Sequence, residues 1–363
     1  MLTKYQGCIL GAVLGDALAM PNESAPCRIS RTPVFSKAYK GHPNQDLFAG
    51  QYTDDGQIIL IAARNLVEGK FSRENYVKEL LRTYNLNKFR YPDGATLSAC
   101  KKMETAKKTA DCGVFSDSAG CLSLAVPFAL GYADKKEMAQ ELVSACILTQ
   151  THPAAHAGTL GLALCLKKIA ETGSFDEGIS DMRLAAQHME PNLAAKIDEA
   201  ILEERRTTPV EYAINIIGTT SSVYHTLPMA VFLCKRMIKR PSELLAVAAS
   251  IGGNCGTIAM ICGAVCGMLY GPRALPENLL PDLERAGIFA ELGEKLYFRA
   301  YPPVIDKIEE EEEPEAEAET EAEAEKEEGT DAEKEKEQEA GEKVDEGEKS
   351  DANSSESEGK KEE

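Results

Sequence analysis

Apolar residues recur at helical spacing along most of the chain up to about residue 305, and hardly any stretch alternates with a period of two. Glycines at positions 7, 11 and 15 give the first helical segment a smooth face that permits close backbone approach. The pattern predicts further helices at 57–67, 74–84, 96–107, 120–130, 135–148, 153–169, 180–188, 193–204, 210–217, 222–238, 242–250, 257–270 and 280–286. Ser, Thr, Asp or Pro marks many of the starts, and Gly or Pro marks several of the ends. We therefore predict an all-α, compact orthogonal bundle of roughly a dozen helices.

One region departs from this pattern. Residues 21–52 carry prolines at positions 21, 26, 33 and 43 and show no helical period. We expect a long loop there, and loops of this length in compact domains are often functional lids.

Charge divides the chain into two parts. Residues 309–363 contain 27 acidic and 7 basic side chains, a net charge of −20, so residues 1–308 carry +1 of the total of −19. We predict one folded domain over 1–305 and an acidic, low-complexity, disordered tail over 306–363, because the tail has almost no apolar side chains to bury. The tail either only aids solubility or contacts basic partners, and both interpretations stay open.

Composition also limits partners and compartment. Nucleic acid is not an expected partner, because Lys and Arg form no stripe along residues 1–308. The longest apolar stretch, 257–270, is too short to span a bilayer, so we expect no membrane partner. The 11 cysteines include no Cys-x-x-Cys pair and sit mostly in apolar helical runs. Buried, reduced thiols and a cytoplasmic location fit this usage.

Two short segments carry candidate chemistry. Gln51-Tyr52-Thr53-Asp54-Asp55 places a hydroxyl and two carboxylates just before a predicted helix. Ile251-Gly252-Gly253-Asn254-Cys255-Gly256-Thr257 is a glycine-rich turn that leads into another. Taken alone, the first segment is a common helix start, since an N-cap hydroxyl and acids in the first turn stabilise the helix. Adjacent carboxylates are also the ligands that Mg²⁺ prefers.

In their order along the chain, these segments resemble the ADP-ribosylglycohydrolase family. The family's first metal motif reads Tyr-Thr-Asp-Asp-Thr, which this chain matches through Asp55. Its second motif reads Gly-Gly-Asp-Thr-Asp-Thr, which aligns with 252–257 but meets Asn254 and Gly256 in place of two aspartates. The opening segment 7–23, Thr151-His152 and the segment 218–230 resemble further family segments. The altered second motif makes the chain look most like the jellyfish lens J-crystallins, a subgroup with a structural role.

The resemblance implies a role for each candidate residue. Thr53, Asp54, Asp55, Asn254 and Thr257 would form a partial metal site, in which Mg²⁺ binds weakly or not at all. Only two of four carboxylates remain there to neutralise two dications. Glu23 would be a vestigial catalytic carboxylate, or only an acid on a surface loop. Gly120, His152, Gly218 and Ser222 would contact ADP-ribose, although each also has an ordinary structural explanation at a turn or helix start.

Asp16, between Gly15 and Ala17, is the one further acid that we expect to be buried. Its apolar neighbours favour a hydrogen-bonding role that ties the following loop in place over a role in catalysis.

Three hypotheses about function follow. The favoured one is a structural, lens-crystallin-type protein that keeps an ADP-ribosylglycohydrolase fold with a degraded metal site. The alternatives are an active or weakly active Mg²⁺-dependent hydrolase of ADP-ribosylated acceptors, and a binder of ADP-ribose without catalysis. In the hydrolase, metal-activated water would attack the ribose.

Overall fold

The structure of the protein is a computed structural model that describes residues 1–303. The predicted acidic tail, residues 306–363, lies outside the described residues. The described part is all-helical. It contains two isolated β-bridges but no strand. Its helices are α1 (Leu2–Ala19), α2 (Asp54–Val67), α3 (Arg73–Asn85), α4 (Gly94–Met103), α5 (Ala125–Gly131), α6 (Lys135–Cys146), α7 (Pro153–Thr172), α8 (Phe175–Met189), α9 (Pro191–Arg205), α10 (Val210–Ile217), α11 (Val223–Met237), α12 (Pro241–Ala248), α13 (Cys255–Tyr270) and α14 (Ala286–Ala300).

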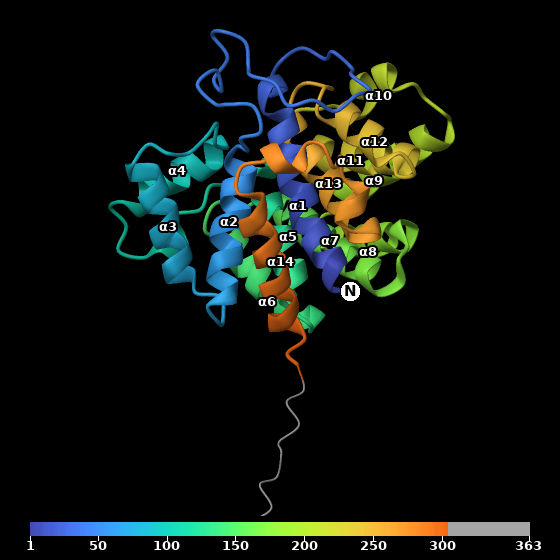
Figure 1. Cartoon of the computed structure of the whole chain (residues 1–363). Coiled ribbons are helices and arrows are strands. Elements are labelled where there is room, and N and C mark those ends of the chain that lie inside the picture. The colour runs from blue at the N-terminus through green and yellow to red at the C-terminus, as the bar shows by residue number, and fades with distance from the viewer. Residues whose placement is uncertain (304–363) are drawn as a thin grey trace, which may run out of the picture. The chain divides into compact units, whose positions relative to one another are not determined.

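Helices α1 and α13 form the centre of the bundle and run side by side (Figure 1). Gly11 and Gly263 face one another so closely that a Cβ on Gly263 would lie 1.9 Å from the Gly11 carbonyl oxygen. Gly7 and Gly267 repeat this contact one turn away, with 1.8 Å for a Cβ on Gly267. The glycine spacing therefore serves the close backbone approach that the sequence predicted. This packing fixes the N-terminus of α13, which carries the glycine-rich motif, against the C-terminal end of α1.

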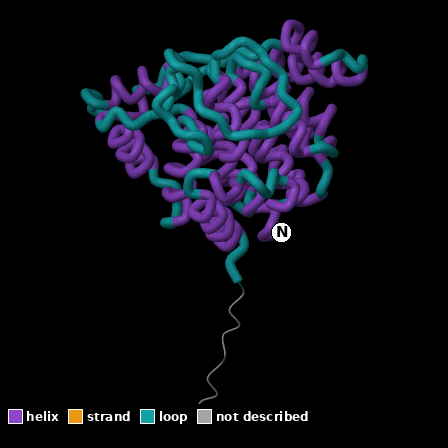
Figure 2. Tube along the Cα trace, turned by 45° about the horizontal axis from the view of Figure 1, so that its top comes forward, coloured by secondary structure: helices purple, strands orange, loops and turns teal. Residues whose placement is uncertain are grey.

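Long loops cross one side of the bundle, while shorter connections lie elsewhere around it (Figure 2). The longest runs from Glu23 to Thr53 and contains no helix, which confirms the predicted loop at 21–52 except that Met20–Asn22 form one turn of 3₁₀ helix. His42 and Asn44 anchor this loop from inside. His42 Nε2 lies 2.7 Å from the Glu23 carbonyl oxygen, and the Asn44 amide donates to the Met20 carbonyl at 3.0 Å.

Three predicted helices differ from those observed. The segment predicted at 120–130 is a 3₁₀ helix, η3 (Ala119–Leu124), followed by α5. The helix predicted at 96–107 ends at Met103. The prediction at 280–286 is wrong: residues 280–282 form one 3₁₀ turn, and Arg285 has a left-handed backbone with φ of 59° that stops propagation. The true last helix, α14, begins only after this residue and was not predicted.

Two further expectations concern apolar segments and cysteines. Within residues 1–303, no helix is both long and apolar enough to cross a bilayer. All 11 cysteines lie in the described part, all have free thiols, and all but Cys27 are buried. The predicted buried, unpaired thiols are therefore observed with that one exception.

Candidate functional site

A cleft of about 450 Å³ lies on the loop side of the bundle, where the first turns of α2 and α13 meet η3. Seven of the predicted site residues line it: Glu23, Thr53, Asp54, Asp55, Gly120, Asn254 and Thr257. The remaining lining residues come mainly from the segments 91–94 and 220–221. Segments about 200 residues apart in the sequence thus converge, as the two motifs predicted.

Asp16 holds the start of helix α2 in place through hydrogen bonds. It is fully buried, and its carboxylate accepts hydrogen bonds from the Thr53 backbone N–H at 2.9 Å, the Thr53 hydroxyl at 2.5 Å and the Gly56 N–H at 2.8 Å. The predicted role of Asp16 in tying the loop is confirmed. Because Thr53 donates its hydroxyl to Asp16, this hydroxyl belongs to the support of the site.

Asp54 and Asp55 occupy the first turn of α2 and point to different partners. Asp54 is half-buried, and one of its carboxylate oxygens accepts the Asp93 backbone N–H at 3.0 Å. Asp55 is buried and accepts a hydrogen bond from the hydroxyl of Ser123. Asp55 therefore links the first motif to η3.

Glu23 is almost fully buried, with 7% of its surface exposed, so the alternative of a surface-loop acid is wrong. Its Oε2 accepts the Gly256 backbone N–H at 2.6 Å and lies 3.7 Å from the Cys255 sulfur. The residue at the N-cap position of α13, Asn254, makes no capping bond with its own side chain. Glu23 therefore caps helix α13 across more than 200 residues of sequence, which satisfies an N–H that helix geometry leaves unpaired.

The two altered positions of the second motif, Asn254 and Gly256, both lie in close contact with other parts of the protein. The Asn254 side-chain amide donates to the Thr226 hydroxyl at 2.8 Å, and its backbone N–H donates to the Thr219 carbonyl at 2.6 Å. A Cβ at Gly256 would lie 2.6 Å from Glu23 Oε2. The Glu23 carboxylate thus fills the space into which any side chain at position 256 would project.

The acids of the cleft are crowded and poorly hydrated. Burial, reinforced by the charge of Asp55, raises the pKa of Asp16 to about 7. Burial raises the pKa of Glu23 to about 8 and that of Asp55 to about 6, and it also raises the pKa of Asp54. Burial and the nearby carboxylates thus disfavour the charged forms of these acids.

The donor set does not fit a pair of Mg²⁺ ions. Across residues 1–303, no group of three or more His, Cys, Asp or Glu side chains is arranged to hold a metal ion. The second motif supplies no carboxylate: Asn254, whose amide N–H donates to Thr226, can offer only a neutral carbonyl oxygen, and Gly256 offers no side chain.

Three predicted ligand-binding residues do not line the cleft. His152 caps helix α7 by accepting the Ala154 N–H at 3.1 Å. Gly218 ends α10 with φ of 91°, a left-handed conformation that favours glycine. Ser222 caps α11, and its hydroxyl donates to Asp117 at 2.6 Å. Their roles in ligand binding stay predictions.

Three residues were not predicted from the sequence: Asp93, which lines the cleft, and Ser123 and Phe115, which lie outside its lining. Asp93 caps α4 and also accepts hydrogen bonds from the Ser118 hydroxyl at 3.1 Å and the Gln150 amide at 2.9 Å. Ser123 donates to Asp55. Phe115 is 75% exposed, with its ring 4.6 Å from that of His152. The signal that could have identified Asp93 is the Pro-Asp-Gly turn at 92–94, which precedes an apolar run.

Comparison with known proteins matches the whole described part to one family. The family model described as ADP-ribosylglycohydrolase matches residues 1–303. An uncharacterized protein of Archaeoglobus fulgidus is 29% identical over 300 residues, which cover 82% of this chain and 97% of that protein.

Two relatives carry functional names. The ADP-ribosylhydrolase ARH3 of Danio rerio is 21% identical, with 82% of this chain and 90% of that protein covered. The ADP-ribosylarginine hydrolase Tri1 of Pseudomonas putida is 23% identical, with 85% and 81% covered. A solved structure described as an ADP-ribosylglycohydrolase-related protein complex superposes with a TM-score of 0.69 at 22% identity, over 82% of this chain and 98% of that one. At this identity the superposition supports the fold alone.

Proposed function

The chain belongs to the ADP-ribosylglycohydrolase family, whose named members include ADP-ribosyl hydrolases, and we propose that it is a member without hydrolytic activity that serves as a structural protein. The observation that carries the proposal is the contact between Glu23 and Gly256. A carboxylate that the family resemblance assigns to catalysis instead caps helix α13, in the space of a missing metal ligand.

The chemistry of the reaction explains why this arrangement is inactive. Water is a poor nucleophile near pH 7 unless a bound cation lowers its pKa. Two dications at short separation repel one another unless carboxylates neutralise them. In this cleft the second motif supplies no carboxylate, so only Asp54 and Asp55 remain of the four that the family resemblance implies.

The structural role rests on the contrast between fold and chemistry. The family model extends over the full described length, so the scaffold is retained where the ligands are lost. A cytoplasmic protein of the lens-crystallin type fits this contrast, because such a role requires stability and solubility but no turnover. The absence of tryptophan, the strongest near-ultraviolet chromophore among the side chains, suits a transparent tissue.

The test is release of ADP-ribose from proteins modified on arginine or on serine, with millimolar Mg²⁺. The Pseudomonas putida relative named as an ADP-ribosylarginine hydrolase serves as the positive control for the arginine-linked substrate. We expect no release above that of the buffer. Release by the unaltered chain that disappears in Asp55→Asn would overturn the proposal.

A second candidate function, binding of ADP-ribose without catalysis, is favoured by the exposed ring of Phe115. The ring stands next to His152, at the start of the segment that leads to Ala119 and Gly120 in the cleft. An aromatic face at this place suits stacking of an adenine base. Calorimetry with ADP-ribose in the presence of a chelator tests this function. Phe115→Ala should weaken binding about tenfold, since stacking of one base contributes about 1–3 kcal/mol, and absence of binding at millimolar ADP-ribose would exclude it.

A further inference from the structure

A second hollow, separate from the cleft, lies between helices α2 and α3. Its volume is about 780 Å³, and we call it the α2–α3 groove. Gln57, Leu60 and Ile61 form part of its floor on α2, and Asn75 and Thr83 lie on α3. Six cationic side chains line it: Arg64, Lys78, Arg82, Lys88, Arg90 and Arg285.

The charge of this groove stands out from that of the domain. The six cations face two lining carboxylates, Glu68 and Glu79, and Glu284 pairs with Arg90, which leaves a net charge of +3. Residues 1–308 together carry only +1. The groove is therefore distinctly positive in a domain that is nearly neutral as a whole, and its concave surface strengthens the local field.

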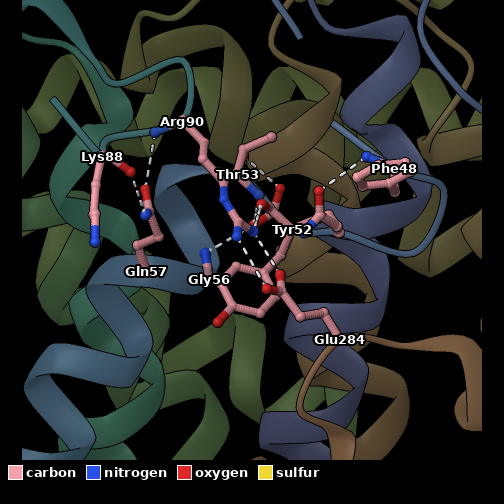
Figure 3. Close-up of polar contacts among 10 residues, drawn as sticks. Phe48, Tyr52, Thr53, Gly56, Gln57, Lys88, Arg90 and Glu284 are labelled. Carbon is pink, nitrogen blue, oxygen red and sulfur yellow. Dashed lines mark hydrogen bonds and ion pairs between the residues drawn. The ribbon is translucent and has the colours of Figure 1, made fainter. Parts of the chain in front are cut away.

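One of the six cations holds the end of the groove in place. Arg90 donates to Glu284 at 2.5 and 3.0 Å and to the Tyr52 carbonyl at 2.9 Å, and its guanidinium lies 5.1 Å from the centre of the Tyr52 ring (Figure 3). Gln57 adds hydrogen bonds to the backbone of Lys88 and Arg90 (Figure 3). Arg90 is thus structural, whereas Arg64, Lys78, Arg82, Lys88 and Arg285 are exposed and available to a ligand.

The spacing of the cations fits an extended chain of negative charges. Lys78 and Arg82 lie one turn apart on α3, so their Cα atoms are separated by about 6 Å along the helix axis. An extended peptide with glutamate at every second position repeats its charge about every 6.6 Å on one face. The groove side of α3, from Asn75 to Arg82, measures about 11 Å, which accommodates two such charges. Lys78 and Arg82 thus offer two charges at the spacing of such a peptide, which a single phosphate would not use.

We propose that the α2–α3 groove is a docking site for an extended, glutamate-rich acidic peptide of a partner protein. The chemistry of such a peptide is present in this chain itself, where residues 309–328 contain 13 glutamates and one lysine, largely in Glu-Ala alternation. This sequence supplies a probe of the right charge and spacing. The proposal does not depend on whether the cleft hydrolyses or binds ADP-ribose.

The test measures binding of a fluorescent peptide with the sequence of residues 309–328 to the full chain by anisotropy. We expect binding that weakens as salt is raised from about 50 mM to about 300 mM, because exposed charges are screened. A peptide with every glutamate replaced by glutamine should not bind. Equally tight binding of the glutamine peptide would overturn the proposal.

A pair of matched double variants locates the site. Lys78→Glu with Arg82→Glu reverses two exposed charges in the groove and should weaken binding about tenfold. Lys136→Glu with Lys239→Glu makes the same change in net charge at exposed lysines outside the groove, and should change binding by less than about twofold. Equal weakening by both variants would show an effect of net charge alone and overturn the proposal.

Carbodiimide coupling, which joins lysines to carboxylates in contact, provides the second measurement. Crosslinks from Lys78 or Lys88 to glutamates of the added peptide support the proposal. Absence of such crosslinks together with absence of peptide binding overturns it. Tighter binding of a single-stranded oligonucleotide of equal charge would also overturn it, because the groove would then be a nucleic-acid site.

Discussion

Replacement of Gly256 by alanine tests the contact between Glu23 and helix α13. The added Cβ would lie 2.6 Å from Glu23 Oε2 and 3.3 Å from Glu23 Cδ, whereas ordinary contacts begin near 3.4 Å. The carboxylate must therefore withdraw, which breaks its 2.6 Å hydrogen bond from the Gly256 N–H. A buried donor left without a partner costs about 1–3 kcal/mol. The higher helix propensity of alanine returns about 0.5–1 kcal/mol, so we expect a net loss of about 1–2 kcal/mol.

A double-mutant cycle separates this contact from other effects. In a Glu23→Ala background the obstacle is gone, so Gly256→Ala should be neutral or stabilising by up to about 1 kcal/mol. The matched control is Gly287→Ala, in the first turn of α14, where a Cβ meets no atom within 4 Å. This control should stabilise the protein by about 0.5 kcal/mol.

Urea unfolding of the full chain, followed by far-ultraviolet circular dichroism, gives the four free energies, since the chain has no tryptophan for fluorescence. The reasoning is refuted if Gly256→Ala is as stable as the wild type in both backgrounds. It is also refuted if the effects of Glu23→Ala and Gly256→Ala simply add.

Three further predictions concern stability. Arg90→Met should cost about 2 kcal/mol in urea unfolding, because Glu284 and the Tyr52 carbonyl lose their donor, whereas Arg82→Met, which breaks only an exposed pair at 3.5 Å, should cost less than about 0.5 kcal/mol. Burial raises the pKa of Asp16 from 3.8 to about 7, so protonated Asp16 contributes to the free energy of unfolding fully below pH 3.8, and this contribution is lost as pH rises through 7. Asp16→Asn should therefore flatten the fall in the free energy of unfolding between these pH values. An unchanged slope would contradict the assignment to Asp16. Deletion of residues 309–363 should leave the melting temperature within about 2 °C, since that segment lacks apolar residues to pack, and a drop of many degrees would show that it contributes to the fold.

Much of the helical architecture could be predicted from apolar spacing, because most helices bury a continuous stripe. The exceptions have local causes that spacing does not report. Arg285 adopts a left-handed conformation, so the helix starts one residue later and extends to Ala300, past the segment that was predicted. The segment at 119–124 is tightened to a 3₁₀ helix, and a Cβ on Gly120 would meet the Asp93 side chain at 2.7 Å.

The candidate site was predictable as far as the two motifs extend. Their resemblance to a family brought together residues 54 and 255, which no local pattern connects. The hydrogen bonds were not predictable, because they depend on side-chain directions set by tertiary packing. Asp93 and Ser123 come from segments whose sequence shows only a turn and a short apolar run. The capping of α13 by Glu23 requires the close approach of α1 and α13, which only the structure reveals.

The measurement that tests the central claim most directly is the number of Mg²⁺ ions bound by the full chain, determined by calorimetry and by equilibrium dialysis near pH 7.5. Loss of two carboxylates predicts at most one ion per chain, with affinity no tighter than millimolar. Asp55→Asn, which removes an acid of the first motif, should remove any binding that is seen. Two ions per chain at micromolar affinity, both lost in Asp55→Asn, would contradict the account and restore the hydrolase hypothesis.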